Sequence, residues 1–152
     1  RIEKEIEEAK KQADVVLVSI HAHETDTENT KVPAMFLETF GRRCVDAGAD
    51  VIIGHGPHEL RGIEIYKGKP IFYSLGNFIF YQSIERPAVA KLTFTADRQA
   101  SWQLLPAKAA GACTSLLTEP EACLEFYEYL SGLSYDVTFS ADGTVAPKRN
   151  EP

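Results

Sequence analysis

Two short apolar runs separated by an amphipathic segment constrain the fold of this chain more than any other feature. Residues 15–20 and 51–53 are rich in Val and Ile and too continuous for half-exposed strands, so we expect strands that are buried on both faces. Between them, Pro33 is placed to open a helix and Gly48 to close it. The pattern predicts a βαβ unit with adjacent, parallel strands and a right-handed crossover, and hence an α/β (α+β) fold. The apolar face of the helix would consist of Phe36, Leu37, Phe40, Cys44 and Ala47.

The remaining segments predict peripheral helices and hairpins. An amphipathic helix with a solvated charged face is expected over residues 1–13. Turn residues between β-type runs predict antiparallel pairs, and Pro120 is placed to open a last helix. The expected pairs are 63–66 with 71–74 and 88–95 with 101–105, the latter around Asp97 and Arg98, and a further turn is expected at Asp142 and Gly143. The inner face of the last helix would hold Cys123, Phe126, Tyr127 and Leu130.

Charge and cysteine content exclude several classes of partner and site. The net charge is −6 and the densest basic stretch is only Lys10–Lys11, so we expect no nucleic-acid partner. No apolar run approaches the about 20 residues of a membrane-spanning helix, so membrane contact is expected only through a segment outside this chain. Cys44, Cys113 and Cys123 lack metal-site spacing. Buried free thiols are expected, with a Cys113–Cys123 disulfide as the alternative.

All four histidines lie in two pairs that follow the two predicted parallel strands. His21 and His23 follow the first strand, and His55 and His58 follow the second. Because the carboxyl ends of parallel strands meet at one edge of a sheet, we expect the four imidazoles to converge there. Imidazole is the commonest side-chain metal ligand and suits zinc, iron and related metals. The sequence therefore predicts a metal site at this edge.

Other interpretations of these residues stay open. The histidines could be ordinary loop residues that hydrogen-bond to the backbone at strand ends. Glu24, Asp26 and Glu59 lie beside the pairs and could be ligands, orienters of imidazole or merely solvated side chains. Asn77 follows Gly76 in a turn between apolar runs, where its amide could reach the site or satisfy its own backbone.

Three ordered segments resemble signatures of the bacterial CapA, or poly-γ-glutamate capsule synthesis, family. They are residues 14–24, 46–58 and 69–78, and the match is dense over residues 14–80. The resemblance implies that residues 1–152 form the C-terminal part of one domain, in which residues 81–152 supply peripheral strands and a helix. The chain starts at Arg1 within a helical pattern, so we expect the N-terminal part of the same domain to lie outside it.

The family is similar to the calcineurin-like metallophosphoesterases. This resemblance implies a β-sandwich flanked by helices and a site with two divalent metal ions, which could be Mn, Fe or Zn. By this resemblance His21, His55 and His58 are metal ligands, His23 is a ligand or catalytic proton donor, and Asn77 is a loop contact to the bound metals. The sequence departs from the common pattern in two places. Two residues separate His55 from His58 instead of one, and His23–Glu24 replaces the Trp and Gly of many members.

Two functions are compatible with this resemblance. One is hydrolysis of a phosphoester by a metal-activated water, with these residues alone expected to bind metal weakly and to be inactive. The other is a non-catalytic module for synthesis, export or anchoring of an acidic polymer. Both imply a location in the bacterial cell envelope, and an acidic polymer or a phosphoester as the partner.

Overall fold

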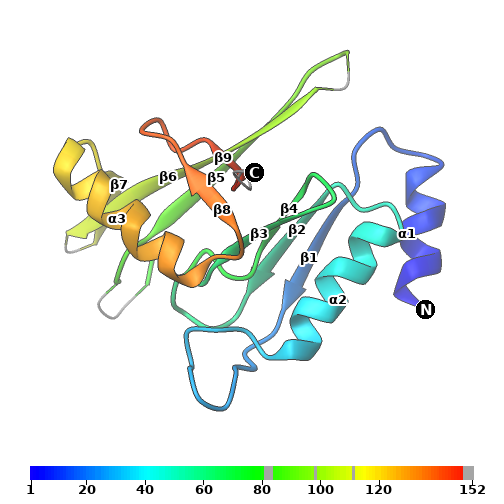
Figure 1. Ribbon diagram of the computed structural model, residues 1–152, viewed down its shortest axis with the longest axis horizontal. Coiled ribbons are helices and arrows are strands. Elements are labelled where there is room, and N and C mark those ends of the chain that lie inside the picture. The colour runs from blue at the N-terminus through cyan, green and yellow to red at the C-terminus, as the bar shows by residue number, and fades with distance from the viewer. Residues whose placement is uncertain (81–83, 98, 111, 149–152) are drawn as a thin grey trace.

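The structure, a computed structural model, describes residues 1–152 except 81–83, 98, 111 and 149–152 (Figure 1). Helices and strands are mixed along the chain, so the predicted α/β class is confirmed. The helices are α1 (Ile2–Lys10), α2 (Met35–Asp46) and α3 (Pro120–Leu133). The strands are β1 (Leu17–His21), β2 (Val51–His55), β3 (Ile63–Tyr66), β4 (Lys69–Phe72), β5 (Ala88–Phe94), β6 (Ala100–Ala110), β7 (Cys113–Leu116), β8 (Val137–Phe139) and β9 (Val145–Pro147).

A four-stranded sheet with the order β1-β2-β4-β3 forms the frame of the molecule. β1 and β2 pair in parallel from Leu17 opposite Val51 to His21 opposite His55, and α2 connects them, as predicted. β4 also runs parallel to β2, whereas β3 and β4 form the predicted antiparallel hairpin. The carboxyl ends of β1, β2 and β4 therefore lie at one edge of this sheet.

The prediction that the first strand is buried on both faces is wrong. β1 alternates between exposed and half-buried residues, and Leu17 is 46% exposed. The reason is its position, because β1 is the edge strand and only one of its faces is covered. Val18 and Ile20 pack against the core beneath α1 and α2, whereas Leu17 projects from the opposite face.

The inner face of α2 differs slightly from the prediction. Leu37 and Cys44 are buried as expected, but Phe36 is 55% exposed. The buried stripe is centred on Gly41, where an added Cβ would lie 3.2 Å from Cγ2 of Ile71. The missing side chain lets the helix approach the sheet closely, which turns Phe36 outward. Gly48 follows the helix with a φ of 110°, as its predicted capping role requires.

Two hydrophobic cores lie on the two faces of this sheet. One joins the sheet to α1 and α2, and the other joins it to the β5-β6-β7 sheet, α3 and the β8-β9 hairpin (Figure 1). The predicted β5–β6 pair and the β8–β9 hairpin are both present, although Arg98 lies outside the described residues. In α3, Phe126, Tyr127 and Leu130 are buried as predicted.

The cysteines only partly follow the prediction of buried thiols. All three are free, and Cys44 is buried, but Cys113 is exposed on β7. Cys113 is the first residue of β7 and faces solvent, while Cys123 is half-buried on α3. In the described part of the chain, no helix is long and apolar enough to cross a bilayer.

Candidate functional site

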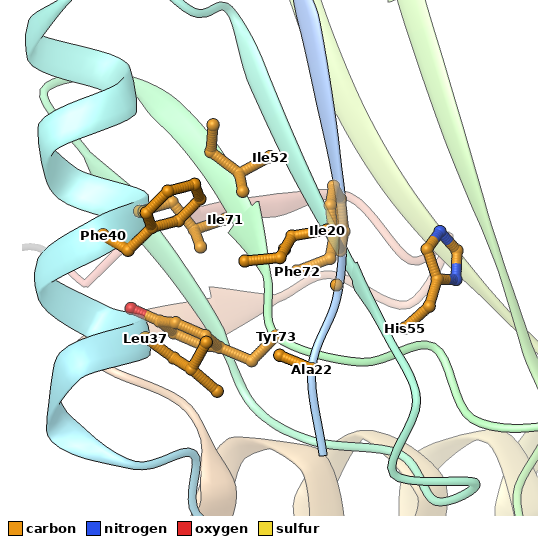
Figure 2. A pocket seen from close by; sticks show the side chains of 11 residues that line it. Ile20, Ala22, Leu37, Phe40, Ile52, His55, Ile71, Phe72 and Tyr73 are labelled. Atoms are coloured by element: carbon orange, nitrogen blue, oxygen red, sulfur yellow. The ribbon is translucent and has the colours of Figure 1, made fainter. Parts of the chain in front are cut away.

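The histidine pairs follow β1 and β2 at the carboxyl edge of the sheet. His21 and His55 are ladder partners at the ends of these strands, and the backbone N–H of Ala22 donates to the His55 carbonyl oxygen at 2.8 Å. Because side chains alternate along a strand, both histidines project from the face opposite α2. Figure 2 shows the His55 ring pointing away from Leu37 and Phe40 of α2.

His21, His23 and His58 form a row of three rings. The Nε2 atoms of His21 and His23 are 3.1 Å apart, and their ring centroids are 4.9 Å apart. The centroid of His58 lies 6.2 Å from that of His23. The structure thus brings together rings from both predicted pairs. His55 is the backbone ladder partner of His21, but no ring contact relates it to the other three histidines in the described part of the chain.

Gly56 makes the close approach of the two histidine segments sterically feasible. Its φ is 121°, a conformation that L side chains rarely adopt. An added Cβ would lie 3.2 Å from Nε2 of His21 and 3.0 Å from the Ala22 carbonyl oxygen. The turn after β2 therefore leaves the His21 ring room only because residue 56 has no side chain.

His58 is held in an unusual backbone conformation beside a polar partner. Its φ is 62°, in the left-handed region, and its Nδ1 lies 2.9 Å from Oδ1 of Asn77. An amide oxygen only accepts hydrogen bonds, so the neutral tautomer that satisfies this contact carries its proton on Nδ1. Asn77 thus reaches the histidine cluster through its side chain, one of the two arrangements that the sequence left open.

The acidic residues beside the pairs are arranged differently. Oδ1 of Asp26 accepts the backbone N–H groups of Glu28 at 2.8 Å and Asn29 at 3.2 Å, so its carboxylate shapes the loop after β1. Glu24 contributes its carbonyl oxygen to a hydrogen bond from Arg61. Among the described residues, no group of three or more His, Cys, Asp or Glu side chains is placed to hold a metal ion.

Comparison with known proteins assigns the chain to a family. The family described as "Bacterial capsule synthesis protein PGA_cap" matches residues 1–82. The chain belongs to the PGA_cap family. It is 49% identical over 82 residues to the PGA biosynthesis protein CapA of Bacillus subtilis. This match covers 53% of this chain and 20% of that protein.

Two further relatives are similar over matches of comparable length. Identity to the capsule biosynthesis protein CapA of Bacillus anthracis is 43% over 86 residues, or 57% of this chain and 20% of the relative. The uncharacterized protein y4sH of Sinorhizobium fredii is 45% identical over 93 residues, or 61% of this chain and 20% of the relative. This PGA_cap chain therefore spans about a fifth of the length of the relatives it matches.

One residue of this PGA_cap site was missed by sequence reasoning. Arg61 is only 1% exposed, and its guanidinium donates to the carbonyl oxygens of His23 and Glu24. The signal in the sequence is that Arg61 lies between Leu60 and the predicted strand that starts at Ile63, just after the second histidine pair. Such a residue is rarely fully buried without a specific partner, so its position could have drawn attention to it.

Proposed function

We propose that the histidine cluster is part of a metal-dependent site for phosphoester hydrolysis in a protein of capsule or poly-γ-glutamate biosynthesis. The proposal rests above all on the 3.1 Å separation of the His21 and His23 Nε2 atoms at the carboxyl edge of the sheet. This edge is where ligands bind in open α/β sheets. The membership of the PGA_cap family supports the biosynthetic context.

The chemistry of the donors fits a transition metal. Two imidazole nitrogens at about 2.1 Å from one tetrahedral ion are about 3.4 Å apart, close to the observed 3.1 Å. The Asn77 contact leaves Nε2 of His58 free to donate to a metal as well. Mn, Fe or Zn would suit these donors, with two ions in the complete site. Bound metal would lower the pKa of a water and stabilise the oxygens of the phosphoryl group.

Each residue has a proposed role in this site. His21, His55 and His58 are proposed as metal ligands, and His23 as a ligand or as the group that gives a proton to the leaving oxygen. Asn77 orients His58 through the hydrogen bond between its Oδ1 and Nδ1 of the ring. Carboxylates that neutralise the metals would come from outside the described residues, because no three-residue metal group is present within them.

The open edge of β1 supports the presence of a further part of the domain. β1 is an edge strand in the described part of the chain, where Leu17 is 46% exposed, and Val15, just before the strand, is 37% exposed. An apolar edge strand is a surface that native proteins normally cover. We propose that the N-terminal part of the same domain packs against it and brings the missing ligands to the histidines. The relatives, which are about five times as long as the matched region, have ample chain for this.

A non-catalytic module for synthesis, export or anchoring of an acidic polymer is the second candidate. It is favoured by the names of the relatives, which refer to capsule and PGA biosynthesis. The net charge of −6 opposes direct binding of polyglutamate, so this role also needs metal to supply positive charge. Either function fits a place in the cell envelope.

Metal content and turnover in the intact protein separate these candidates. The protein is loaded with Mn²⁺, Fe²⁺ or Zn²⁺ and assayed on a generic aryl phosphodiester, with the His21→Ala variant beside it. Turnover that His21→Ala abolishes would support the hydrolase. Bound metal without turnover would support the binding module, and a wild-type protein that binds no metal would contradict both.

A further inference from the structure

Arg61 is a buried cation whose hydrogen-bond partners all belong to one loop. Its guanidinium donates through Nη1 to the Glu24 carbonyl oxygen at 2.9 Å. Through Nη2 it donates to the carbonyl oxygens of His23 at 3.1 Å and Thr30 at 3.3 Å. Its Nε has no hydrogen-bond partner in the described part of the chain. The side chain is 1% exposed, so water does not replace a protein partner easily.

The loop that receives these bonds carries His23 and connects β1 to α2. Its two ends meet where the Ala34 N–H donates to the Glu24 carbonyl oxygen at 3.3 Å and the Asp26 N–H donates to that of Val32 at 2.9 Å. Arg61 donates hydrogen bonds to Glu24, where the two ends of the loop meet, and to Thr30 on the far side of the loop. One side chain thus ties together parts of the loop that its own backbone bonds leave separate.

Stability alone is a poor explanation for this arrangement. A buried charge with neutral partners loses its hydration and gains no ion pair, and an apolar side chain of similar volume is often as stabilising. Burial lowers the pKa of Arg61, which reflects the same unfavourable environment. What an apolar residue could not supply is a planar fork that fixes several carbonyl groups at once.

We propose that Arg61 is a positioning residue that places the His23 ring against His21 by fixing the main chain at His23 and Glu24. The His23 carbonyl accepts from Nη2, and the ring of the same residue lies with its Nε2 at 3.1 Å from that of His21. Rotation or displacement of this segment would change the position of Nε2 of His23 relative to that of His21. The consequence for metal binding rests on the proposed function, whereas the placement of His23 does not.

The choice of arginine at residue 61 leads to a graded expectation. Arg61→Lys keeps the charge and three N–H donors, but all three are on one nitrogen, so they cannot span the separate carbonyl groups as the guanidinium does. Arg61→Met keeps much of the volume and removes every donor. Arg61→Met should therefore displace the His23 ring more than Arg61→Lys does, relative to wild type.

The test follows the His23 ring directly in the intact protein, with ¹⁵N-labelled histidine. Arg61→Met should shift the His23 ring resonances, weaken the His21–His23 inter-ring contact and speed amide exchange at Asp26 and Val32. Zn²⁺ affinity, measured by titration, should fall about 10- to 100-fold, as for loss of other groups that orient ligands. Arg61→Lys should restore part of each signal.

Asp50→Asn is the matched control. Asp50 is also a buried charged residue, but it lies just before β2, at the opposite end of that strand from His55. Its variant should lower the melting temperature without altering the His23 resonances or Zn²⁺ affinity.

Unchanged His23 resonances in Arg61→Met would overturn the proposal, as would equal shifts in both variants. If wild type binds none of Zn²⁺, Mn²⁺ and Fe²⁺, the proposed function fails, while the His23 resonances still decide the role of Arg61. If Arg61→Met does not fold, Arg61→Lys decides by the same signals.

Discussion

The Nε2 atoms of His21 and His23 lie 3.1 Å apart, although Ala22 separates the two residues in sequence. Strand β1 ends at His21, and the turn that follows brings the second ring back onto the first. Two neutral imidazoles at this distance can share one proton in a hydrogen bond or donate two lone pairs to one metal ion. The proposed site uses the second option, because ligands of open α/β sheets bind at this edge of the sheet.

Variants of His58 can separate the effect of its backbone conformation on stability from the effect of its imidazole on metal binding. Its φ of 62° suits asparagine better than alanine, because the left-handed region costs an ordinary residue about 1–2 kcal/mol. We expect His58→Asn to be more stable than His58→Ala by about 1 kcal/mol, while both lose the imidazole and bind metal weakly. Urea unfolding and metal titration of the two variants test this. Equal stability of the variants, or metal affinity retained in either, would contradict the assignment.

Gly56 tests the steric fit of the histidine edge. Gly56→Ala should destabilise the protein by about 1–3 kcal/mol, because it combines a positive φ with a Cβ at 3.2 Å from Nε2 of His21. Gly68→Ala is the control, since Gly68 also has a positive φ but an added Cβ there meets nothing within 4 Å. Only Gly56→Ala should shift the His21 ring resonances. Similar shifts in both variants would show that the close contact is unimportant.

Asp50 should make stability depend on acid pH. Burial alone would raise the pKa of this carboxyl, but hydrogen bonds from Lys10, Lys69 and the Val16 N–H hold it below its ordinary value. A lowered folded pKa means that the stabilisation is complete above the unfolded pKa of about 3.9 and is lost as pH falls through the folded pKa.

Asp50→Asn should therefore lower the free energy of unfolding at pH 7 by about 2–4 kcal/mol, since it leaves two lysines without their shared carboxylate. The difference from wild type should begin to shrink as pH falls below about 4, the pKa of the unfolded carboxyl, and should vanish only below the lowered pKa of folded Asp50. Urea unfolding of both proteins at several pH values measures it. A difference that stays constant down to pH 2 would contradict this role.

The sequence predicted those features that depend on local pattern. The runs at residues 15–20 and 51–53 gave the parallel pair, and the helix between them followed from its apolar spacing and Gly48. Because strand direction then determines where the strands end, the approach of the His21, His23 and His58 rings also followed. The His55 ring was expected to join them, but the described contacts relate His55 to His21 only through the β1–β2 ladder. Hairpin turns were found for the same reason, since their residues carry the turn geometry themselves.

Features that depend on distant contacts were not predictable in this way. A continuous apolar run does not tell whether the chain at hand covers both faces of a strand, so the exposure of Leu17 was missed. Gly41 shifted the inner face of α2 because its contact, Ile71, comes from a strand much later in the chain. Arg61 meets its partners in a loop more than 30 residues earlier, and no periodicity records that contact.

The most direct test of the metal site is metal stoichiometry in the intact protein for wild type and for His21→Ala, with thermal melting of the same samples. The proposal predicts stoichiometric Mn²⁺, Fe²⁺ or Zn²⁺ in wild type and loss of that metal in His21→Ala, with the apo proteins melting at similar temperatures. A ligand at an exposed strand end contributes little to core packing, so the fold should survive its loss. Full metal occupancy in His21→Ala, or loss of metal only through unfolding, would contradict the assignment of the histidine edge as a metal site.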